Sequence, residues 1–183
     1  MPEQDRACLC MICRDYGDRD RLDVADTRLV ANIGEYGWGV IMIGADDVSE
    51  GWAFTVGLWH SHRLPELAMF GLDITKTKTC LNLLAGRLLD GESAVAETRV
   101  DGVLTNGPVL LKDVEPEWHR AFFGTAGGFY RATRGVRFLQ ALWPDEDGLF
   151  PGESDFAPQL RERQPLLWEH PLEHPKGPWT EQV

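Results

Sequence analysis

Three cysteines stand close together near the amino terminus of the 183-residue chain, at Cys8, Cys10 and Cys13. One intervening residue and then two allow a tight turn to present all three thiolates to one soft cation. Zinc in structural sites takes four ligands at tetrahedral angles, and cysteine sets with such spacing commonly supply three of them. The sequence therefore predicts a zinc-type site at these cysteines.

The fourth ligand would come from Cys80, His60 or His62, or from a water molecule at an open position. Other chemistries stay open for the cluster. Cys10 and Cys13 form a Cys-X-X-Cys pair, a spacing that lowers a thiol pKa and favours redox activity. An iron–sulfur cluster is chemically feasible, although its usual spacings differ. The cysteines could also be unligated thiols at a frayed terminus.

A second polar group lies between two apolar stretches, residues 52–59 and 67–72, which we expect to be buried strands. The turn between them carries His60, His62 and Glu66. Side chains two apart on a strand share a face, so both imidazoles could reach one metal or ligand. Glu66 could then orient an imidazole or act as a base. These three residues are the candidates for catalysis, against the alternative that the histidines have surface roles and Glu66 lies in solvent.

A glycine-rich segment with arginines, residues 124–134, concentrates positive charge in an otherwise acidic chain. Backbone amides beside arginines can bind phosphate or carboxylate groups. The candidates for binding a flavin or a nucleotide are Gly127, Gly128, Arg131 and Arg134. No Walker motif is present, nor a Gly-X-Gly-X-X-Gly after a strand. The alternative is a flexible loop whose arginines pair with acidic residues elsewhere.

Hydrophobic periodicity predicts the elements that must position these groups. Helices are expected over residues 19–33, 74–90 and 115–123, and strands over residues 37–44, 52–59, 67–72, 94–100, 108–114 and 136–143. Asp18 or Asp20 would cap the first helix and Gly34 would end it, while Asp73 would cap the second. The mixed order predicts an α+β fold, mostly an antiparallel sheet of about six strands with two to three packed helices.

We expect one domain over residues 1–183. It comprises a cysteine arm (1–16), an α+β core (17–143) and a long irregular tail rich in proline and tryptophan, packed on the core (144–183). Leu166, Leu167, Trp168 and Trp179 are the tail residues that indicate this packing.

The net charge of −11 argues against general affinity for nucleic acid or an anionic membrane, since both require a basic face. No apolar run approaches the roughly 18 residues of a membrane span. The polar first six residues lack the apolar core of a signal peptide. We therefore expect a cytoplasmic protein, in which reduced thiols favour metal or redox chemistry over disulfides.

Several motifs in order along the chain carry a family resemblance. They include the cysteine cluster, Tyr36-Gly-Trp-Gly-Val40, Trp52-Ala-Phe-Thr-Val-Gly-Leu58, Pro65-Glu-Leu67 and Gln140-Ala-Leu-Trp-Pro-Asp145. Together they resemble the bacterial domain-of-unknown-function family 4262. That family implies no activity and no catalytic residues.

The residues favour a non-enzymatic module with a structural zinc-type site, which binds a protein partner or a second copy of itself. The alternatives are a small metal-dependent enzyme with a Cys/His site and, ranked lower, a flavin- or nucleotide-binding protein.

Overall fold

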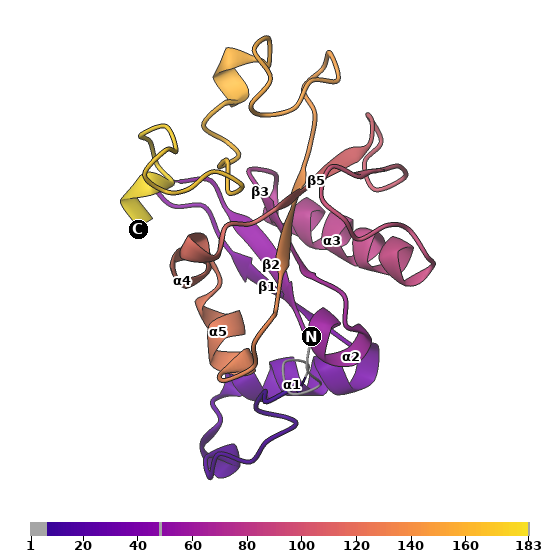
Figure 1. The fold of residues 1–183 in the computed structure, drawn as a ribbon, viewed down its shortest axis with the longest axis vertical. Coiled ribbons are helices and arrows are strands. Elements are labelled where there is room, and N and C mark those ends of the chain that lie inside the picture. Colours follow the sequence, from indigo (N-terminus) through magenta and orange to yellow (C-terminus); the bar gives the residue numbers. More distant parts are fainter. Residues whose placement is uncertain (1–6, 48, 183) are drawn as a thin grey trace.

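A six-stranded mixed sheet forms the centre of the computed structural model, which describes residues 7–47 and 49–182 (Figure 1). Its strands are β1 (Gly39–Ile43), β2 (Trp52–Val56), β3 (Glu66–Phe70), β4 (Arg99–Val100), β5 (Val109–Asp113) and β6 (Phe138–Leu142). They lie in the order β1-β2-β3-β6-β5-β4, in which the β3–β6 pair is parallel and the other four pairs among the described residues are antiparallel. The predicted α+β fold with a mostly antiparallel sheet is confirmed.

Helices cover both faces of this sheet. They are α1 (Val24–Tyr36), α2 (Leu58–His62), α3 (Ile74–Leu89), α4 (His119–Phe122) and α5 (Gly124–Tyr130), with single 3₁₀ turns at Arg19–Arg21, Pro116–Trp118, Pro158–Leu160 and Thr180–Gln182. Helix α3 lies on one face and α4 and α5 lie on the other, while α1 and α2 are at one end (Figure 1).

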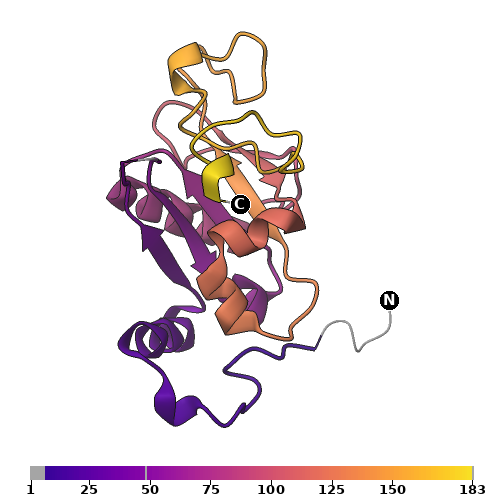
Figure 2. The ribbon, with the colours of Figure 1, turned by 90° about the vertical axis from the view of Figure 1, so that its left-hand side faces the viewer.

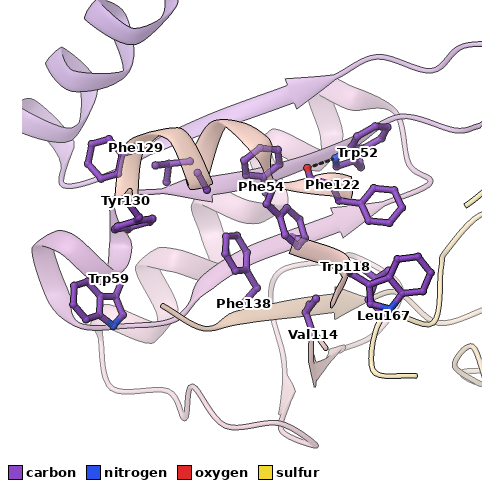
Figure 3. Close-up of a cluster of buried hydrophobic side chains, with 14 of the residues drawn as sticks. Trp52, Phe54, Trp59, Val114, Trp118, Phe122, Phe129, Tyr130, Phe138 and Leu167 are labelled. Atoms are coloured by element: carbon purple, nitrogen blue, oxygen red, sulfur yellow. Dashed lines mark hydrogen bonds between the residues drawn. The ribbon is translucent and has the colours of Figure 1, made fainter. Parts of the chain in front are cut away.

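Side chains of the central strands alternate between two separate cores, as the pleat of a strand requires. In β2, Trp52 and Phe54 point into an aromatic core, whereas Ala53 points into an aliphatic one. In β3, Phe70 joins the aromatic core and Met69 the aliphatic one. Figure 3 shows the aromatic core beneath α4 and α5. The two faces of the sheet are thus built from different kinds of residue.

The chain after β6 folds back onto the aromatic face (Figure 2). Leu167 and Trp179 belong to the aromatic core and are almost entirely buried. The side chain of Gln140 in β6 donates to Pro165 O and accepts from the amide of Leu167, at 2.8 and 3.2 Å. These bonds satisfy a buried amide and hold the tail against the sheet. Residues 1–6 of the expected amino-terminal arm lie outside the described residues.

The start of α1 differs from the prediction. The helix begins at Val24, and the carboxylate of Asp23 caps it by accepting from the amide of Asp26. The prediction of Asp18 or Asp20 as the cap was therefore wrong. Gly34 lies inside the helix, which ends at Gly37 in a left-handed conformation with φ of 90°. The helical spacing of Leu22, Ala25, Leu29 and Ile33 pointed to the buried face, and of these Leu29 and Ile33 are buried, whereas Ala25 is exposed and Leu22 precedes the helix.

The prediction for α3 is confirmed at its start, where Asp73 accepts hydrogen bonds from the amides of Thr75 and Lys76. The strand predicted at residues 37–44 was expected to be buried on both faces. Instead, β1 lies at the edge of the sheet, and most of its residues are only partly buried.

Candidate metal centre and the buried glutamate beside it

The segment that carries the histidines is a short helix, not the continuation of a strand into a turn. Strand β2 ends at Val56, and Gly57 follows with φ of 115°. A Cβ atom at Gly57 would lie 2.8 Å from Ile33 Cγ1 and 3.0 Å from Gly37 O, so a larger residue does not fit there. The chain then enters α2, which presents His60 toward the amino-terminal cysteines.

Glu66 holds the first turn of α2 in place. One carboxylate oxygen accepts from the amides of Gly57 and Trp59, at 2.9 and 3.1 Å, and from the hydroxyl of Tyr130 in α5. The other oxygen accepts from the hydroxyl of Thr55 at 2.5 Å. Burial raises the pKa of Glu66, and the four donors partly oppose that effect. Glu66 therefore connects the helix bearing His60 to both β2 and α5.

The expectation that Glu66 lies in solvent was wrong, because it is the first residue of β3 and has no exposed surface. A signal in the sequence could have found it. Glu66 has the same strand parity as Ala68 and Phe70, both of which face the aromatic core.

The three cysteines and His60 form one compact group. The Nδ1 atom of His60 lies 3.5 Å from the Sγ of Cys8, 3.4 Å from that of Cys10 and 3.5 Å from that of Cys13. All four ligand atoms lie within 4.8 Å of one another. Around tetrahedral zinc, bond lengths near 2.3 Å to sulfur and 2.0–2.1 Å to nitrogen place the two ligand atoms about 3.6 Å apart. The arrangement is thus of the size that one metal ion requires.

Hydrogen bonding does not account for this group. A single imidazole nitrogen either donates one proton or offers one lone pair, so it pairs well with one thiol and not with three. The cysteines are free thiols in this structure and form no disulfide with one another. A shared cation satisfies all four atoms at once.

Contacts with α5 and the loop after it hold the cysteine segment against the helix. The amide of Met11 donates to Phe129 O at 3.0 Å, and the amide of Leu9 donates to the hydroxyl of Thr133 at 2.9 Å. Further along, Arg131 pairs with Asp18 at 2.7 Å. Two backbone amides of the cysteine segment, at Leu9 and Met11 between the cysteines, are therefore bonded to α5 or to the loop after it.

Burial opposes ionisation of two of the three thiols, so a cation that binds here must compete with their protons. Burial raises the pKa of the Cys10 thiol to about 12 and also raises the pKa of Cys13. Burial lowers the pKa of His60 and keeps its imidazole neutral at pH 7. A divalent ion would bind here by displacing thiol protons.

Cys80 and His62, the other two residues considered for the fourth ligand position, lie elsewhere. Cys80 is buried in the aliphatic core, where its thiol donates to Val103 O at 3.8 Å. His62 contacts the ring of Trp38, with centroids 6.4 Å apart. Among the three residues, His60 is the one that shares the group with the cysteines.

The alternative that the glycine-rich segment is a flexible loop was wrong for its first seven residues, because Gly124–Tyr130 form α5. Ala126, Phe129 and Tyr130 face the core at helical spacing, a signal that the glycines concealed. Gly127 and Arg131 line a pocket on this helix, whereas Gly128 and Arg134 do not. Binding of a flavin or a nucleotide there stays a prediction.

Within the described residues, no helix combines the length and apolar character needed to cross a membrane. No curated protein and no solved structure shows significant similarity to this chain. The family described as a domain of unknown function (DUF4262) matches residues 32–157, which include α2, the buried Glu66 and α5. Because this match covers more than half of the sequence, the chain belongs to the DUF4262 family.

Proposed function

We propose that Cys8, Cys10, Cys13 and His60 bind one zinc ion as a structural site. The observation that carries this proposal is the near-equal distance, 3.4 to 3.5 Å, from His60 Nδ1 to each of the three sulfurs. Thiolate and imidazole are ligands that zinc prefers, and three cysteines with one histidine are a common structural zinc set. The close spacing of the ligand atoms favours a mononuclear ion over a cluster.

The zinc ion would fasten the amino-terminal segment to α2. The three cysteines lie 47 to 52 positions before His60 in the sequence. A shared metal would therefore close a long loop between the amino-terminal segment and α2. Cross-links that close long loops restrict the unfolded chain most. A fourth protein ligand also leaves no coordination position for a reactive water, which supports a structural role over an enzymatic one.

We propose further that the protein is a non-enzymatic module that binds a partner protein through the open edge of β1. β1 pairs with β2 on one side and has no strand neighbour on the other within the described residues. A groove of about 430 Å³ beside it is lined by Tyr36, Trp38 and Val40 among others. Open edges with apolar neighbours accept an added strand from another chain.

Elemental analysis tests the zinc site. Reduced, untagged protein should contain one zinc per chain, and the combined Cys8→Ser, Cys10→Ser, Cys13→Ser variant should contain none. Cys80→Ser is the matched control and should keep its metal, because Cys80 lies in the other core. Sub-stoichiometric metal in the reduced wild type would overturn the proposal.

X-ray absorption at the zinc edge separates the structural site from the enzymatic alternative. We expect three sulfur ligands and one nitrogen. An oxygen ligand in place of the imidazole would show an open position and would favour a small metal-dependent enzyme.

A photocrosslinking residue at Met42 tests the partner surface. Met42 is in β1 and 46% exposed, while Leu83 on α3 is 48% exposed and serves as the control position. A crosslinked partner from Met42 and none from Leu83 would support the β1 edge. A crosslinked dimer of this chain would identify the partner as a second copy, and equal products at both positions would contradict the assignment.

A further inference from the structure

A pocket of about 400 Å³ lies beside α5, and none of the four proposed zinc ligands is among the residues that line it. Its apolar walls include Phe123 and Phe138, whose rings stack with centroids 4.2 Å apart, together with Val136. Arg120 and Arg131 also line the pocket. The volume is within the range of small-molecule sites, roughly 300–1,000 Å³.

The charge of this pocket is opposite to that of the protein. The chain holds 29 acidic residues against 18 basic ones, yet no aspartate or glutamate is among the described residues that line the pocket. Arg131 is paired with Asp18, whereas Arg120 makes no ion pair with any described residue. Arg120 is thus free to meet a ligand's negative charge.

Glycines keep one wall of the pocket open. Gly124 and Gly127 line it, and a Cβ atom at either position would meet nothing within 4 Å. Glycine is an unfavourable residue inside a helix, and here no contact in the protein demands it. The absent side chains leave room against the helix for something else.

A histidine in the same pocket has an unmet hydrogen bond. The Nε2 atom of His119 is buried and has no hydrogen-bond partner. The ring packs beside Phe138, with centroids 4.9 Å apart. Buried polar atoms are normally satisfied, so this nitrogen, which is covered in the structure, would gain a bond if a turn of the ring brought it to a ligand group.

We propose that this pocket binds a small aromatic anion. Its ring would lie against Phe138 and the glycine face of α5, and its charged group would contact Arg120 and His119. The pocket is separate from the four atoms proposed to bind zinc, and this proposal does not depend on the metal.

The test uses two fluorescent probes with the same aromatic body, in the full chain. One is 8-anilinonaphthalene-1-sulfonate, and the other is N-phenyl-1-naphthylamine, which lacks the sulfonate. We expect saturable binding of one sulfonate probe per chain, and at least about tenfold weaker binding of the neutral probe, as expected for loss of one charge-assisted contact. Equal affinity for both probes, or no saturable binding of the sulfonate, would overturn the proposal.

Variants locate the binding. Arg120→Gln should weaken the sulfonate probe about tenfold and leave the neutral probe unchanged. Gly127→Leu should abolish binding of both, whereas Gly128→Leu, on the same helix but outside the lining, should leave both unchanged. Circular dichroism checks that each variant is folded. If the Gly127 or Gly128 variant unfolds, the result for Arg120→Gln, at an exposed position, is sufficient to test the proposal. Wild-type affinity for the sulfonate probe in Arg120→Gln and Gly127→Leu would place binding elsewhere and refute the proposal.

Discussion

On one face of the sheet, the 16-residue helix α3 covers an aliphatic core, whereas on the other face two short helices and the tail cover an aromatic one. Helix α3 carries its own apolar stripe and its own cap at Asp73. Helices α4 and α5 have no side-chain cap at their amino ends, and contacts with distant parts of the chain hold them. The proposed metal centre and the buried Glu66 both lie on the aromatic side, in contact with α5 or with the segment bonded to it. The face that assembles from long-range contacts is thus the one that carries the proposed metal centre.

Removing the metal ligands should have the largest effect and should be confined to the aromatic face. A ligand present at about 1,000 times its Kd stabilises the folded state by about 4 kcal/mol, so the combined Cys8→Ser, Cys10→Ser, Cys13→Ser variant should lose at least about that amount in excess zinc. Hydrogen exchange should show lost protection at the Met11 amide, which bonds Phe129 O, and retained protection in α3. An equal loss of hydrogen-exchange protection on both faces would contradict the view that the metal stabilises the aromatic face alone.

Leu81→Ala is the corresponding change on the aliphatic face. Leu81 lies on the buried face of α3 and has no exposed surface, so its truncation should cost about 3 kcal/mol, within the usual span for leucine in a core. Urea unfolding measures this cost, and zinc content should stay at one per chain. Leu83→Ala, at an exposed position of the same helix, is the control and should change stability little. A lowered zinc content in Leu81→Ala would show that the two faces are coupled.

Glu66→Gln should cost about 2 kcal/mol, because an amide nitrogen replaces an oxygen that accepts hydrogen bonds in a buried site. The loss should extend to the metal centre, since Glu66 holds the turn of α2 that carries His60. Zinc affinity should therefore fall in this variant, which competition with a chelator measures. An unchanged affinity would mean that His60 is positioned without Glu66.

The cost of Glu66→Gln should also depend on pH when it is measured with the metal removed. Burial raises the pKa of Glu66 above the unfolded value near 4.5, so the folded chain keeps a proton that the unfolded chain loses. The stability contributed by Glu66 is then fully present below that unfolded pKa and declines as pH rises toward the folded pKa. Glutamine has no such proton, so the difference between wild type and variant should shrink from pH 4.5 to pH 8. A growing difference would contradict the raised pKa.

The same division explains what could be predicted from the sequence. The 74–90 helix, its Asp73 cap and the first five residues of the predicted 52–59 strand follow from local periodicity and from hydrogen bonds between near neighbours in the sequence. The fold class follows from the order of such elements. Helix α5 was missed because three glycines obscured the spacing of its apolar residues, whose partners lie in the sheet.

The site could be predicted only in part, for a physical reason. The spacing of the cysteines is local and indicated a metal, but the choice of His60 over His62 depends on α2. That helix exists because Gly57 turns the chain and Glu66 binds its first amides, nine and seven positions away. The apolar residues at 52–59 favoured a strand instead of α2. No local pattern in the sequence indicated that the Glu66 carboxylate bonds Tyr130 in α5.

The smallest predicted effect compares the same substitution on the two faces. The Thr133 hydroxyl accepts from the amide of Leu9, so Thr133→Val leaves that amide without its partner and should cost about 1 kcal/mol. The Thr77 hydroxyl in α3 donates to Asp73 O, a carbonyl that also accepts from the Thr77 amide. The Thr77 hydroxyl also donates to Leu72 O at a longer 3.4 Å, so Thr77→Val removes contacts to carbonyls but leaves no backbone amide without its partner, and it should cost less. Zinc affinity should fall with Thr133→Val alone, because Leu9 lies between two proposed ligands. Unchanged stability and unchanged zinc affinity in Thr133→Val would show that the cysteine segment is held by its metal and not by this bond.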